Sequence, residues 1–336
     1  MSSPVLIYRL GSLGDTLVAL PCFHQIARAF PDSERIVLTN NPVSGAAPAL
    51  EAVIGGSGLI HRSIAYDVGE RSRTQLIRLL LKVRATGART MIYLAAGRGL
   101  ETVARDLKFF RYAGIRKVIG APTTPDLHDN RIEQDGAAIE PEAERLARTI
   151  ADLGPIDLAH RDNWDLCLTA GEMAKAREAL APLAGKPFLA ISIGTKLPAN
   201  DWGKDNWLAL LSRLGEEMQG LPLVGLGGGG DFAATERLLR RWPGDKLNLC
   251  GPLTPRQSAA VLGRAALFIG HDSGPMHLAA TAGAPTLGLF GDNNPPRKWH
   301  PYGAHCEAIQ DMAGVRHIGV DHVVARALAL SRCAHV

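Results

Sequence analysis

The sequence predicts an α/β fold built from two doubly wound parallel sheets, each in its own domain. Short apolar or β-branched runs alternate with longer amphipathic patterns along the chain, which is typical of repeated strand and helix units. The same plan occurs in both halves, and in the second half a glycine closes each apolar run. At 336 residues the chain also exceeds the length that one hydrophobic core usually serves.

In chain order, the first half predicts strands at residues 4–10, 35–40, 89–96 and 116–121, and helices at 15–30 and 140–154. The second half predicts strands at 187–194, 221–228, 246–251, 266–270 and 286–291, and helices at 206–218, 232–242, 255–265 and 274–283. We therefore predict an N-terminal domain of residues 1–170 and a C-terminal domain of residues 171–336, with a hinge near 165–186. The last helix is a candidate to pack back on the N-terminal domain.

The composition argues against several classes of protein. A net charge of +4 without a block of Lys or Arg gives no sign of a nucleic-acid-binding arm, although it suits an anionic ligand, an anionic membrane surface or an ordinary enzyme. The first apolar run breaks at Arg9 and no apolar stretch reaches about eighteen residues, so neither a signal peptide nor a spanning helix is expected. The five cysteines are scattered and lack a CxxC pair, which indicates a reducing compartment. We expect a cytoplasmic protein that is able to contact a membrane face.

The first candidate site is the turn in RLGSLGDTLVALP, where Gly14 precedes Asp15 at the start of the first helix. One interpretation is that Asp15 is the N-cap of this helix. The other is that its carboxylate, placed after the first strand, accepts a proton from a substrate hydroxyl. In the same domain Arg71, Arg73 and Arg98 are either solvated side chains or contacts for an anionic substrate.

A second candidate follows the strand of ISIGTKLPANDWGKDNW. Thr195 and Lys196 offer a hydroxyl and an ammonium after a small turn, which suits a phosphate group, although an exposed loop is the alternative. Asn200 and Lys204 follow in the same stretch, and its two tryptophans are expected to pack against the next helix.

The stretch GLGGGGD, residues 225–231, satisfies a GxGxxG pattern after a strand and would predict a dinucleotide site. The acidic residue that should end the following strand is missing, because Cys250 and Gly251 stand there. A close approach of Gly227 and Gly228 to some other ligand and a flexible loop remain as alternatives.

The stretch HDSGPMHLAA follows the strand at 266–270. Asp272 and Ser273 end that strand, Gly274 and Pro275 begin a helix, and His277 lies in its first turn. The free amides of a helix start attract anions, so these residues predict an anion site. The alternative is a histidine satisfied at a domain interface. Because the sequence has no DxD triplet and its histidines are irregularly spaced, we expect chemistry without a metal.

These motifs, in this order and over nearly the whole chain, resemble glycosyltransferase family 9, the ADP-heptose:lipopolysaccharide heptosyltransferase family. The resemblance rests on RLGSLGDTLVALP, on SIGTK with DWGKDNW, and on NLCGPLTPRQSAAVLGRAALFIGHDSGPMHLAATAGAPTLGLFG. It implies a GT-B fold, in which two Rossmann-like domains face each other across a cleft. It also implies inverting, metal-independent transfer, with the donor bound mainly by the C-terminal domain and the acceptor mainly by the N-terminal one.

The resemblance assigns the role of general base to Asp15 and no role to His271. The donor-diphosphate contacts that it implies are Thr195, Lys196, Asp272, Ser273, Gly274 and His277. The family often carries Lys and Pro where this chain has Asn200 and Gly203. Either Lys196 or Lys204 supplies the charge instead, or the diphosphate is held less tightly. Secondary candidates for the site are Gly14, Asn200, Lys204, Gly227 and Gly228.

The expected function is transfer of a heptose or related sugar from a nucleotide donor, ADP-heptose, to a lipopolysaccharide core or another bacterial surface glycan. The expected partners are the nucleotide sugar, a lipid-linked or oligosaccharide acceptor and the inner membrane face, without nucleic acid and without a cofactor. Three alternatives stay open: the same chemistry with another nucleotide sugar and acceptor, an NAD-type dinucleotide enzyme, and a non-catalytic sugar-nucleotide or glycan-binding protein.

Overall fold

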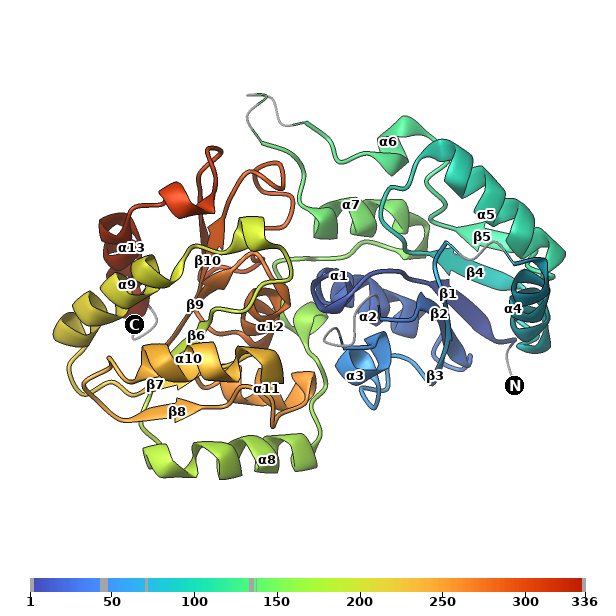
Figure 1. Cartoon of the computed structure of the whole chain (residues 1–336). Coiled ribbons are helices and arrows are strands. Elements are labelled where there is room, and N and C mark those ends of the chain that lie inside the picture. Colours follow the sequence, from blue (N-terminus) through green and yellow to red (C-terminus); the bar gives the residue numbers. More distant parts are fainter. Residues whose placement is uncertain (1–2, 43–47, 70–71, 133–135, 137, 334–336) are drawn as a thin grey trace. The chain divides into compact units, whose positions relative to one another are not determined.

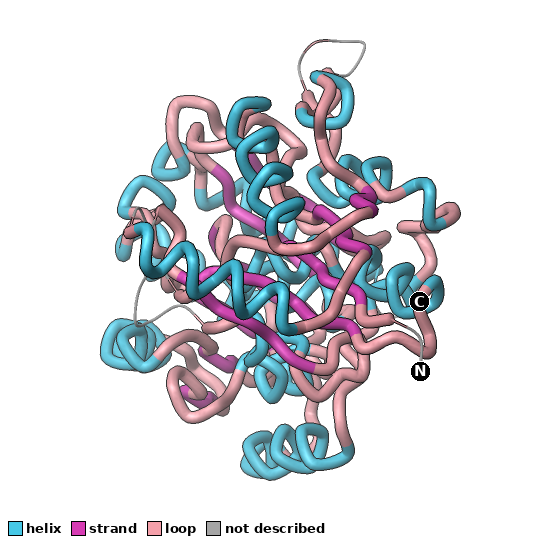
Figure 2. The backbone as a smooth tube through the Cα atoms, turned by 90° about the vertical axis from the view of Figure 1, so that its right-hand side faces the viewer, coloured by secondary structure: helices cyan, strands magenta, loops and turns pink. Residues whose placement is uncertain are grey.

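The computed structural model describes residues 3–42, 48–69, 72–132, 136 and 138–333. The chain divides into two compact units, Met1–Cys167 and Leu168–Val336. Each unit holds one parallel sheet with helices on its faces (Figures 1 and 2). The predicted α/β class with two doubly wound sheets is therefore confirmed.

The sheet of the first unit has the strand order β3-β2-β1-β4-β5. Its strands are β1 (Val5–Tyr8), β2 (Arg35–Asn40), β3 (Arg62–Tyr66), β4 (Thr90–Tyr93) and β5 (Lys117–Ile119). The helices are α1 (Leu13–Val18), α2 (Leu20–Ala29), α3 (Leu50–Ile54), α4 (Arg73–Ala85), α5 (Leu100–Tyr112), α6 (Pro125–His128) and α7 (Glu142–Thr149), with short 3-10 turns at η1 (Ala151–Leu153) and η2 (Arg161–Trp164). The central strands are buried on both faces, which explains their continuous apolar runs.

The sheet of the second unit has the order β11-β10-β9-β6-β7-β8. Its strands are β6 (Leu189–Ser192), β7 (Leu223–Gly225), β8 (Lys246–Asn248), β9 (Leu267–His271), β10 (Thr286–Phe290) and β11 (Cys306–Gln310). The helices are α8 (Ala170–Leu180), α9 (Lys204–Glu217), α10 (Phe232–Leu239), α11 (Pro255–Leu262), α12 (Gly274–Ala282) and α13 (Val320–Cys333). Short 3-10 turns lie at η3 (Ala181–Leu183), η4 (Pro198–Asn200), η5 (Gly229–Asp231) and η6 (Val315–His317). The last helix, α13, packs against α9, β9 and β10 of this same unit.

The sequence analysis missed two strands, β3 and β11, and five helices, α3, α4, α5, α6 and α8. Both strands, β3 and β11, lie at a sheet edge and are only partly buried, so neither has a continuous apolar run. The helix α4 carries large aliphatic side chains on its outward side as well as its inward side, which obscures the amphipathic period. The predicted helix at 15–30 is present but divides at Ala19 into α1 and α2.

No helix in the described ranges is both long enough and apolar enough to cross a membrane. Burial raises the pKa of the Cys22 thiol to about 12 and that of the Cys250 thiol to about 11. Both thiols are therefore protonated at neutral pH, which makes them packing groups rather than nucleophiles.

Candidate functional site

The strand order shows where each sheet is built to bind a ligand. In doubly wound sheets ligands bind beyond the carboxyl ends of the strands, where the strand order reverses. This point lies between β1 and β4 in the first unit and between β6 and β9 in the second. The segments that follow β1, β6 and β9 contain Asp15, Thr195, Lys196 and residues 272–277. The topology thus places the principal predicted residues at the two switch points.

Asp15 lies in the first turn of α1, three residues after the cap, Ser12. Its Oδ2 accepts hydrogen bonds from the Ser12 backbone N–H (2.8 Å) and the Ser12 hydroxyl (3.2 Å). The interpretation of Asp15 as the N-cap is therefore wrong, because Ser12 is the N-cap. Asp15 is the third residue of the helix, and its carboxylate accepts a hydrogen bond from the backbone N–H of this N-cap residue. None of the hydrogen bonds identified in the described part of the chain uses Oδ1 of Asp15. That oxygen is the one available to a substrate proton.

Gly11 makes the approach of this carboxylate to the turn possible. Its φ is +131°, and a Cβ added there would lie 2.3 Å from Cβ of Asp15. The Gly11 N–H donates a hydrogen bond to Oδ1 of Asn40 at the end of β2 (2.7 Å). The glycine that this geometry requires is therefore Gly11, whereas Gly14 lies inside α1.

Arg9, which the sequence analysis treated only as the end of an apolar run, is completely buried. Its guanidinium donates hydrogen bonds to the carbonyl oxygen of Leu94 (2.7 Å) and to the carbonyl oxygen of Asp15. Burial lowers the pKa of Arg9, while the nearby carboxylates of Asp15 and Glu142 oppose that shift. This buried cation joins the segment after β4 to the first turn of α1. A charged residue at the end of an apolar strand is the sequence signal that could have found it.

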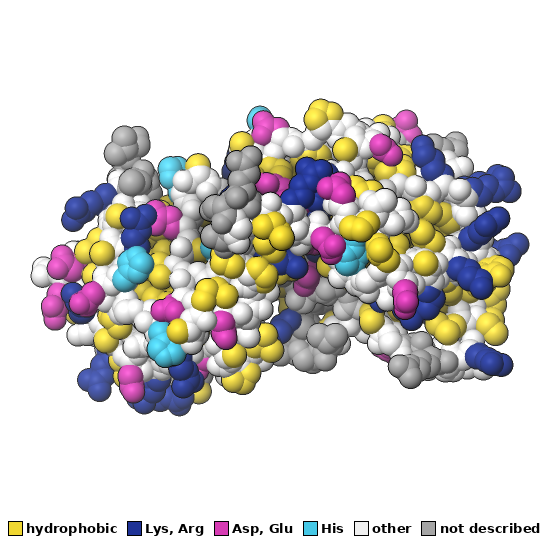
Figure 3. All heavy atoms as spheres, turned by 90° about the horizontal axis from the view of Figure 1, so that it is seen from above, with side chains coloured by type: hydrophobic (Ala, Val, Ile, Leu, Met, Phe, Trp, Pro, Cys, Tyr) yellow, Lys and Arg dark blue, Asp and Glu magenta, His cyan; other side chains and the backbone are white. Residues whose placement is uncertain are grey.

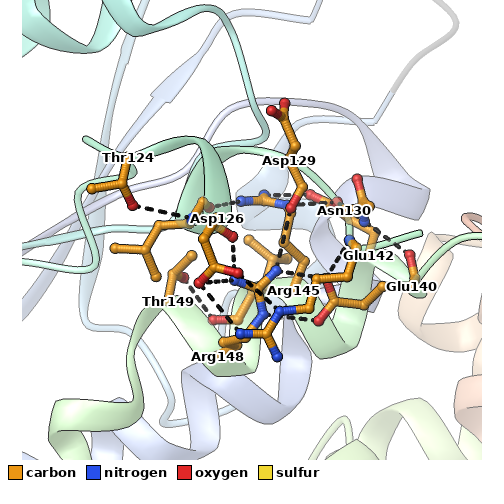
Figure 4. A network of polar contacts seen from close by, with 12 residues as sticks. Thr124, Asp126, Asp129, Asn130, Glu140, Glu142, Arg145, Arg148 and Thr149 are labelled. Atoms are coloured by element: carbon orange, nitrogen blue, oxygen red, sulfur yellow. Dashed lines mark hydrogen bonds and ion pairs between the residues drawn. The ribbon is translucent and has the colours of Figure 1, made fainter. Parts of the chain in front are cut away.

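A network of ion pairs on α7 supports the same region of the first unit (Figure 4). Arg145 and Glu142 form a pair (2.6 Å) in which both side chains are 1% exposed. Arg145 also donates a hydrogen bond to the carbonyl oxygen of Ala95, just after β4 (3.3 Å). Nearer the surface, Arg148 pairs with Glu140 (2.6 Å). The network therefore holds α7 to the loop that borders the switch point.

Of the three arginines that were candidates to contact an anionic substrate, Arg98 belongs to a cluster of polar side chains. Arg98 donates a hydrogen bond to the Tyr8 hydroxyl (2.8 Å) and pairs with Asp106 (3.4 Å). Arg73 is the exposed first residue of α4, and Arg71 lies outside the described residues. Arg98 is therefore held by side chains of its own unit.

In the second unit, the segment after β6 begins with a turn stabilised by Thr195. The Thr195 hydroxyl donates to the carbonyl oxygen of Leu197 (3.2 Å), and the Leu197 N–H donates to the same hydroxyl oxygen (3.3 Å). Lys196 is exposed, and so is Lys204, the first residue of α9. Both ammonium groups are therefore solvent-accessible, as a contact with a phosphate requires.

Asn200 is buried and connects the two segments that border the second switch point. Its side-chain amide donates a hydrogen bond to the carbonyl oxygen of Asp272 (3.1 Å). Its Oδ1 accepts a hydrogen bond from the side chain of Asn293. Asn200 therefore organises the backbone of the site.

His271, to which the sequence analysis assigned no role, is fully buried at the end of β9. Its Nε2 accepts hydrogen bonds from the backbone N–H of Trp202 (3.1 Å) and from Nε1–H of Trp207 (3.2 Å). Burial lowers the pKa of His271 to about 4, so the ring is neutral at neutral pH. As expected, both tryptophans are buried packing residues. His271 accepts a hydrogen bond from the backbone N–H of the first and from the indole N–H of the second.

Asp272 and the start of α12 lie at the second switch point. Ser273 caps α12, and Gly274 is its first residue. The Asp272 carboxyl accepts a hydrogen bond from the side chain of Asn294 (2.7 Å), and burial raises its pKa to about 6. His277 is 6% exposed, with its ring centroid 6.3 Å from that of Trp299. The first turn of α12 thus stands beside a carboxyl group that accepts a proton easily.

The glycine-rich loop is occupied by its own acidic residue. The Gly228 N–H donates a hydrogen bond to the Asp231 carboxylate (2.9 Å), and a Cβ on Gly194 or Gly227 would lie within 2.7 Å of the same carboxylate. In a dinucleotide site the amides of this loop would face a pyrophosphate. A carboxylate bonded to the Gly228 amide argues against that interpretation of GLGGGGD.

Comparisons with known proteins show the family and the fold of the chain. The sequence model of the family described as glycosyltransferase family 9 (heptosyltransferase) matches residues 125–314. A search of curated proteins gave no significant match.

Three solved structures illustrate what the chain is similar to. A glycosyl transferase of family 9 from Veillonella parvula has a TM-score of 0.75 and 19% identity, over 99% of this chain and 99% of that chain. ADP-heptose lipopolysaccharide heptosyltransferase II from E. coli has a TM-score of 0.68 and 16% identity, over 99% of this chain and 100% of that chain. The E. coli heptosyltransferase WaaC with ADP has a TM-score of 0.67 and 16% identity, over 97% of this chain and 99% of that chain. The shared fold is the GT-B type, with two Rossmann-like domains.

Proposed function

Because the chain belongs to glycosyltransferase family 9, the heptosyltransferase family, we propose that it transfers a heptose or a related sugar from a nucleoside diphosphate donor. The donor is ADP-heptose, and the acceptor is a lipopolysaccharide core or another bacterial surface glycan. The ADP-heptose heptosyltransferase and the WaaC–ADP structure, both similar to this chain over most of their length, support that choice of nucleotide. The enzyme works in the cytoplasm, and a lipid-linked acceptor brings it to the inner membrane face.

The observation that carries the proposal is the second switch point, where α12 begins beside Asp272 and Asn200. First-turn amides of a helix attract an anion, and here they follow directly on β9, at the position where this fold binds ligands. Burial raises the pKa of Asp272 to about 6, and the negative charge of a bound diphosphate raises it further, so the carboxyl takes up a proton and the repulsion falls. The Lys196 ammonium, exposed after β6, supplies a positive charge to the same group.

The proposed mechanism divides the chemistry between the two units. Oδ1 of Asp15 removes the proton from the acceptor hydroxyl while that oxygen attacks the anomeric carbon of the donor. The bond from the anomeric carbon to the diphosphate breaks, the sugar inverts its configuration, and the nucleoside diphosphate leaves with the bonding electrons. The start of α12, with Lys196 and His277, stabilises the charge that develops on the leaving group. We assign no metal or cofactor to these steps.

The first experiment identifies the nucleotide. Thermal unfolding is followed with ADP, UDP, GDP and NADH, and then with the sugar conjugate of whichever diphosphate stabilises the protein. Selective stabilisation by ADP supports the proposal, whereas selective stabilisation by UDP or GDP keeps the chemistry and changes the donor. Stabilisation by NADH alone, or by none of these compounds, would overturn it.

The second experiment separates the two roles of Asp15. In Asp15→Asn the side chain keeps an oxygen that can accept the Ser12 N–H but loses its basicity. We expect transfer to fall about 10²–10⁴-fold while nucleotide affinity is unchanged. Ser12→Ala is the matched control, because it removes the hydroxyl contact and leaves the carboxylate, so its transfer rate should stay near that of the wild type. Full transfer activity in Asp15→Asn would show that the residue serves only the helix start.

A further inference from the structure

The outward side of α4 is unusually apolar for a surface helix. Leu79 and Val83 face the sheet and are buried, whereas Ile77 and Leu81, one turn apart, are 57% and 56% exposed. Helical periodicity places Leu81 opposite the buried pair, on the side where a solvated helix carries polar residues. Two large aliphatic side chains in one outward row indicate a surface that meets an apolar partner.

The same side of α4 is strongly basic. Its sequence contains Arg73, Arg78, Lys82 and Arg84 and no acidic residue. By helical periodicity, Arg73 and Arg84 flank Ile77 and Leu81 on one side, and Arg78 and Lys82 flank them on the other. The aliphatic row is thus bordered on both sides by positive charge.

The neighbouring helix α5 extends this surface. Side chains of α4 and α5 belong to one buried cluster on the same face of the sheet, so the outward sides of the two helices point the same way. The outward side of α5 adds exposed Arg105, Lys108 and Arg111 against one exposed acid, Glu101. Tyr112, at the end of the helix, is 63% exposed. In Figure 3 the Lys and Arg side chains gather along the right-hand edge, at the end where Figure 1 places α4. We call this α4–α5 surface the basic-apolar face.

A hollow beside α4 adds room for a polar headgroup. It has a volume of about 360 Å³, lies where β2 and β3 end, and is lined by two cations, Arg78 and Lys82, and one acid, Asp67, among other residues. The Asp67 carboxylate accepts a hydrogen bond from the Asn41 side chain (2.7 Å). Two cations against one carboxylate leave the hollow with a net positive charge, which suits a phosphate group.

We propose that the basic-apolar face docks the enzyme on an anionic phospholipid bilayer. Ile77 and Leu81 enter the boundary between headgroups and acyl chains, and the flanking Arg and Lys side chains extend to the lipid phosphates. Tyr112 lies at headgroup level, where aromatic rings with a polar tip are favoured. Each basic residue near an anionic surface strengthens the attraction, so apolar insertion and charge act together.

The charge pattern favours a bilayer over a second copy of this chain. A two-fold dimer through α4 would bring its arginines and lysine against the same residues of the other copy, and α4 itself carries no acidic residue to pair with them. A bilayer supplies both the negative charge and the apolar interior. The inference rests on the proposed membrane contact alone, so it is tested without nucleotide or acceptor.

The test is sedimentation of the full-length protein with vesicles. Vesicles of phosphatidylethanolamine with phosphatidylglycerol should carry the wild type down at low salt, whereas vesicles of phosphatidylcholine alone should not. The double variant Ile77→Ser/Leu81→Ser should lower the partition coefficient about 10-fold or more, and Arg78→Glu/Lys82→Glu should do the same and reduce the salt dependence.

Matched controls use the second unit. Phe232→Ser/Met312→Ser changes two exposed apolar residues there, and Arg240→Glu/Arg241→Glu reverses two exposed charges. Both should sediment as the wild type does, and all four variants should keep its unfolding temperature, since every changed side chain is exposed.

Three results would overturn the assignment. The first is a wild type that does not bind the anionic vesicles, and the second is variants of the basic-apolar face that bind as tightly as the controls. The third is a change from dimer to monomer in Ile77→Ser/Leu81→Ser, which would make this face an interface between copies. Each result leaves the nucleotide and transfer experiments unaffected, so failure of the docking proposal and failure of the proposed reaction can be told apart.

Discussion

The side-chain amide of Asn200 donates a hydrogen bond to the main-chain carbonyl oxygen of Asp272 over 3.1 Å. This bond joins the segment after β6 to the segment after β9, the two strands between which the second sheet reverses its order. Members of glycosyltransferase family 9 often have a lysine where this chain has Asn200. Here the position does not supply a positive charge; its side chain instead connects the two loops of the proposed donor site.

Asn200→Ala should weaken both the second unit and its nucleotide site. The substitution leaves the Asp272 carbonyl and the Asn293 amide without their partner, which costs about 1–3 kcal/mol of unfolding free energy. Because the loops after β6 and β9 lose their connection, ADP affinity should fall about 10-fold, as 1.4 kcal/mol of lost preorganisation implies. Urea unfolding and titration calorimetry measure the two effects.

The control for this prediction is Asn248→Ala. The Asn248 amide bonds the carbonyl oxygen of Phe232 and the Glu236 carboxylate, neither of which lies in the two loops. It should lose a similar amount of stability and keep its ADP affinity. An Asn200→Ala protein with wild-type stability and affinity would contradict the connecting role.

His271 and Asp272 should give opposite pH dependences to stability. Burial lowers the pKa of His271 to about 4, so its contribution is present above about pH 6.5 and is lost as the pH falls towards 4. Burial raises the pKa of Asp272 to about 6, so its contribution is present below about pH 4 and is lost as the pH rises through 6. Between these limits the two contributions partly cancel in the wild type.

In Asp272→Asn the effect of His271 on the pH dependence of stability should therefore no longer be partly cancelled. Between about pH 6.5 and 4 the unfolding free energy of this variant should fall more steeply than that of the wild type, by about 2–3 kcal/mol over the window. Denaturant unfolding at a series of pH values measures the difference. Asp205→Asn, which changes an exposed carboxylate at the start of α9, is the control and should follow the wild-type curve. Parallel curves for Asp272→Asn and the wild type would refute the assignment.

Breaking the buried ion pair of Glu142 and Arg145 should lower the unfolding free energy much more than replacing both residues with apolar ones. Arg145→Met leaves a buried carboxylate unpaired and should lower the stability of the first unit by about 3–5 kcal/mol. The double variant Glu142→Met/Arg145→Met removes both charges and should be more stable than the single variant. A double variant less stable than Arg145→Met would contradict the claim that the unpaired carboxylate causes the loss of stability. For comparison, Lys175→Met breaks an exposed pair with Glu178 and should change the unfolding free energy by less than about 0.5 kcal/mol.

Removal of divalent metal should leave the proposed transfer reaction unchanged. If the helix start at Ser273, together with Lys196, stabilises the leaving diphosphate, a cation is not needed for that step. Transfer assayed with excess EDTA should stay within about 2-fold of the rate with added Mg²⁺, because the protein's own donors are already in position. A rate that collapses in EDTA and returns with Mg²⁺ or Mn²⁺ would show that these groups are insufficient.

Local sequence was enough to predict most of the second sheet and the start of α12. The apolar run at 286–291 and the Ser-Gly-Pro turn before His277 are signals that depend only on neighbouring residues, and β10 and α12 form there. The same kind of signal is missing for β3 and β11. Edge strands are partly solvated, so their side chains need no continuous apolar pattern.

Only the tertiary structure decided which side chains meet. Asn200 and Asp272 lie 72 residues apart, and the bond between them exists because the strand order makes β6 and β9 neighbours. Arg9 and His271 likewise had no role in the sequence analysis, since their partners come from the segment after β4 and from the stretch before α9. Periodicity and helix caps are written in adjacent residues, whereas the partner of a buried polar group is set by the strand order that brings distant segments together.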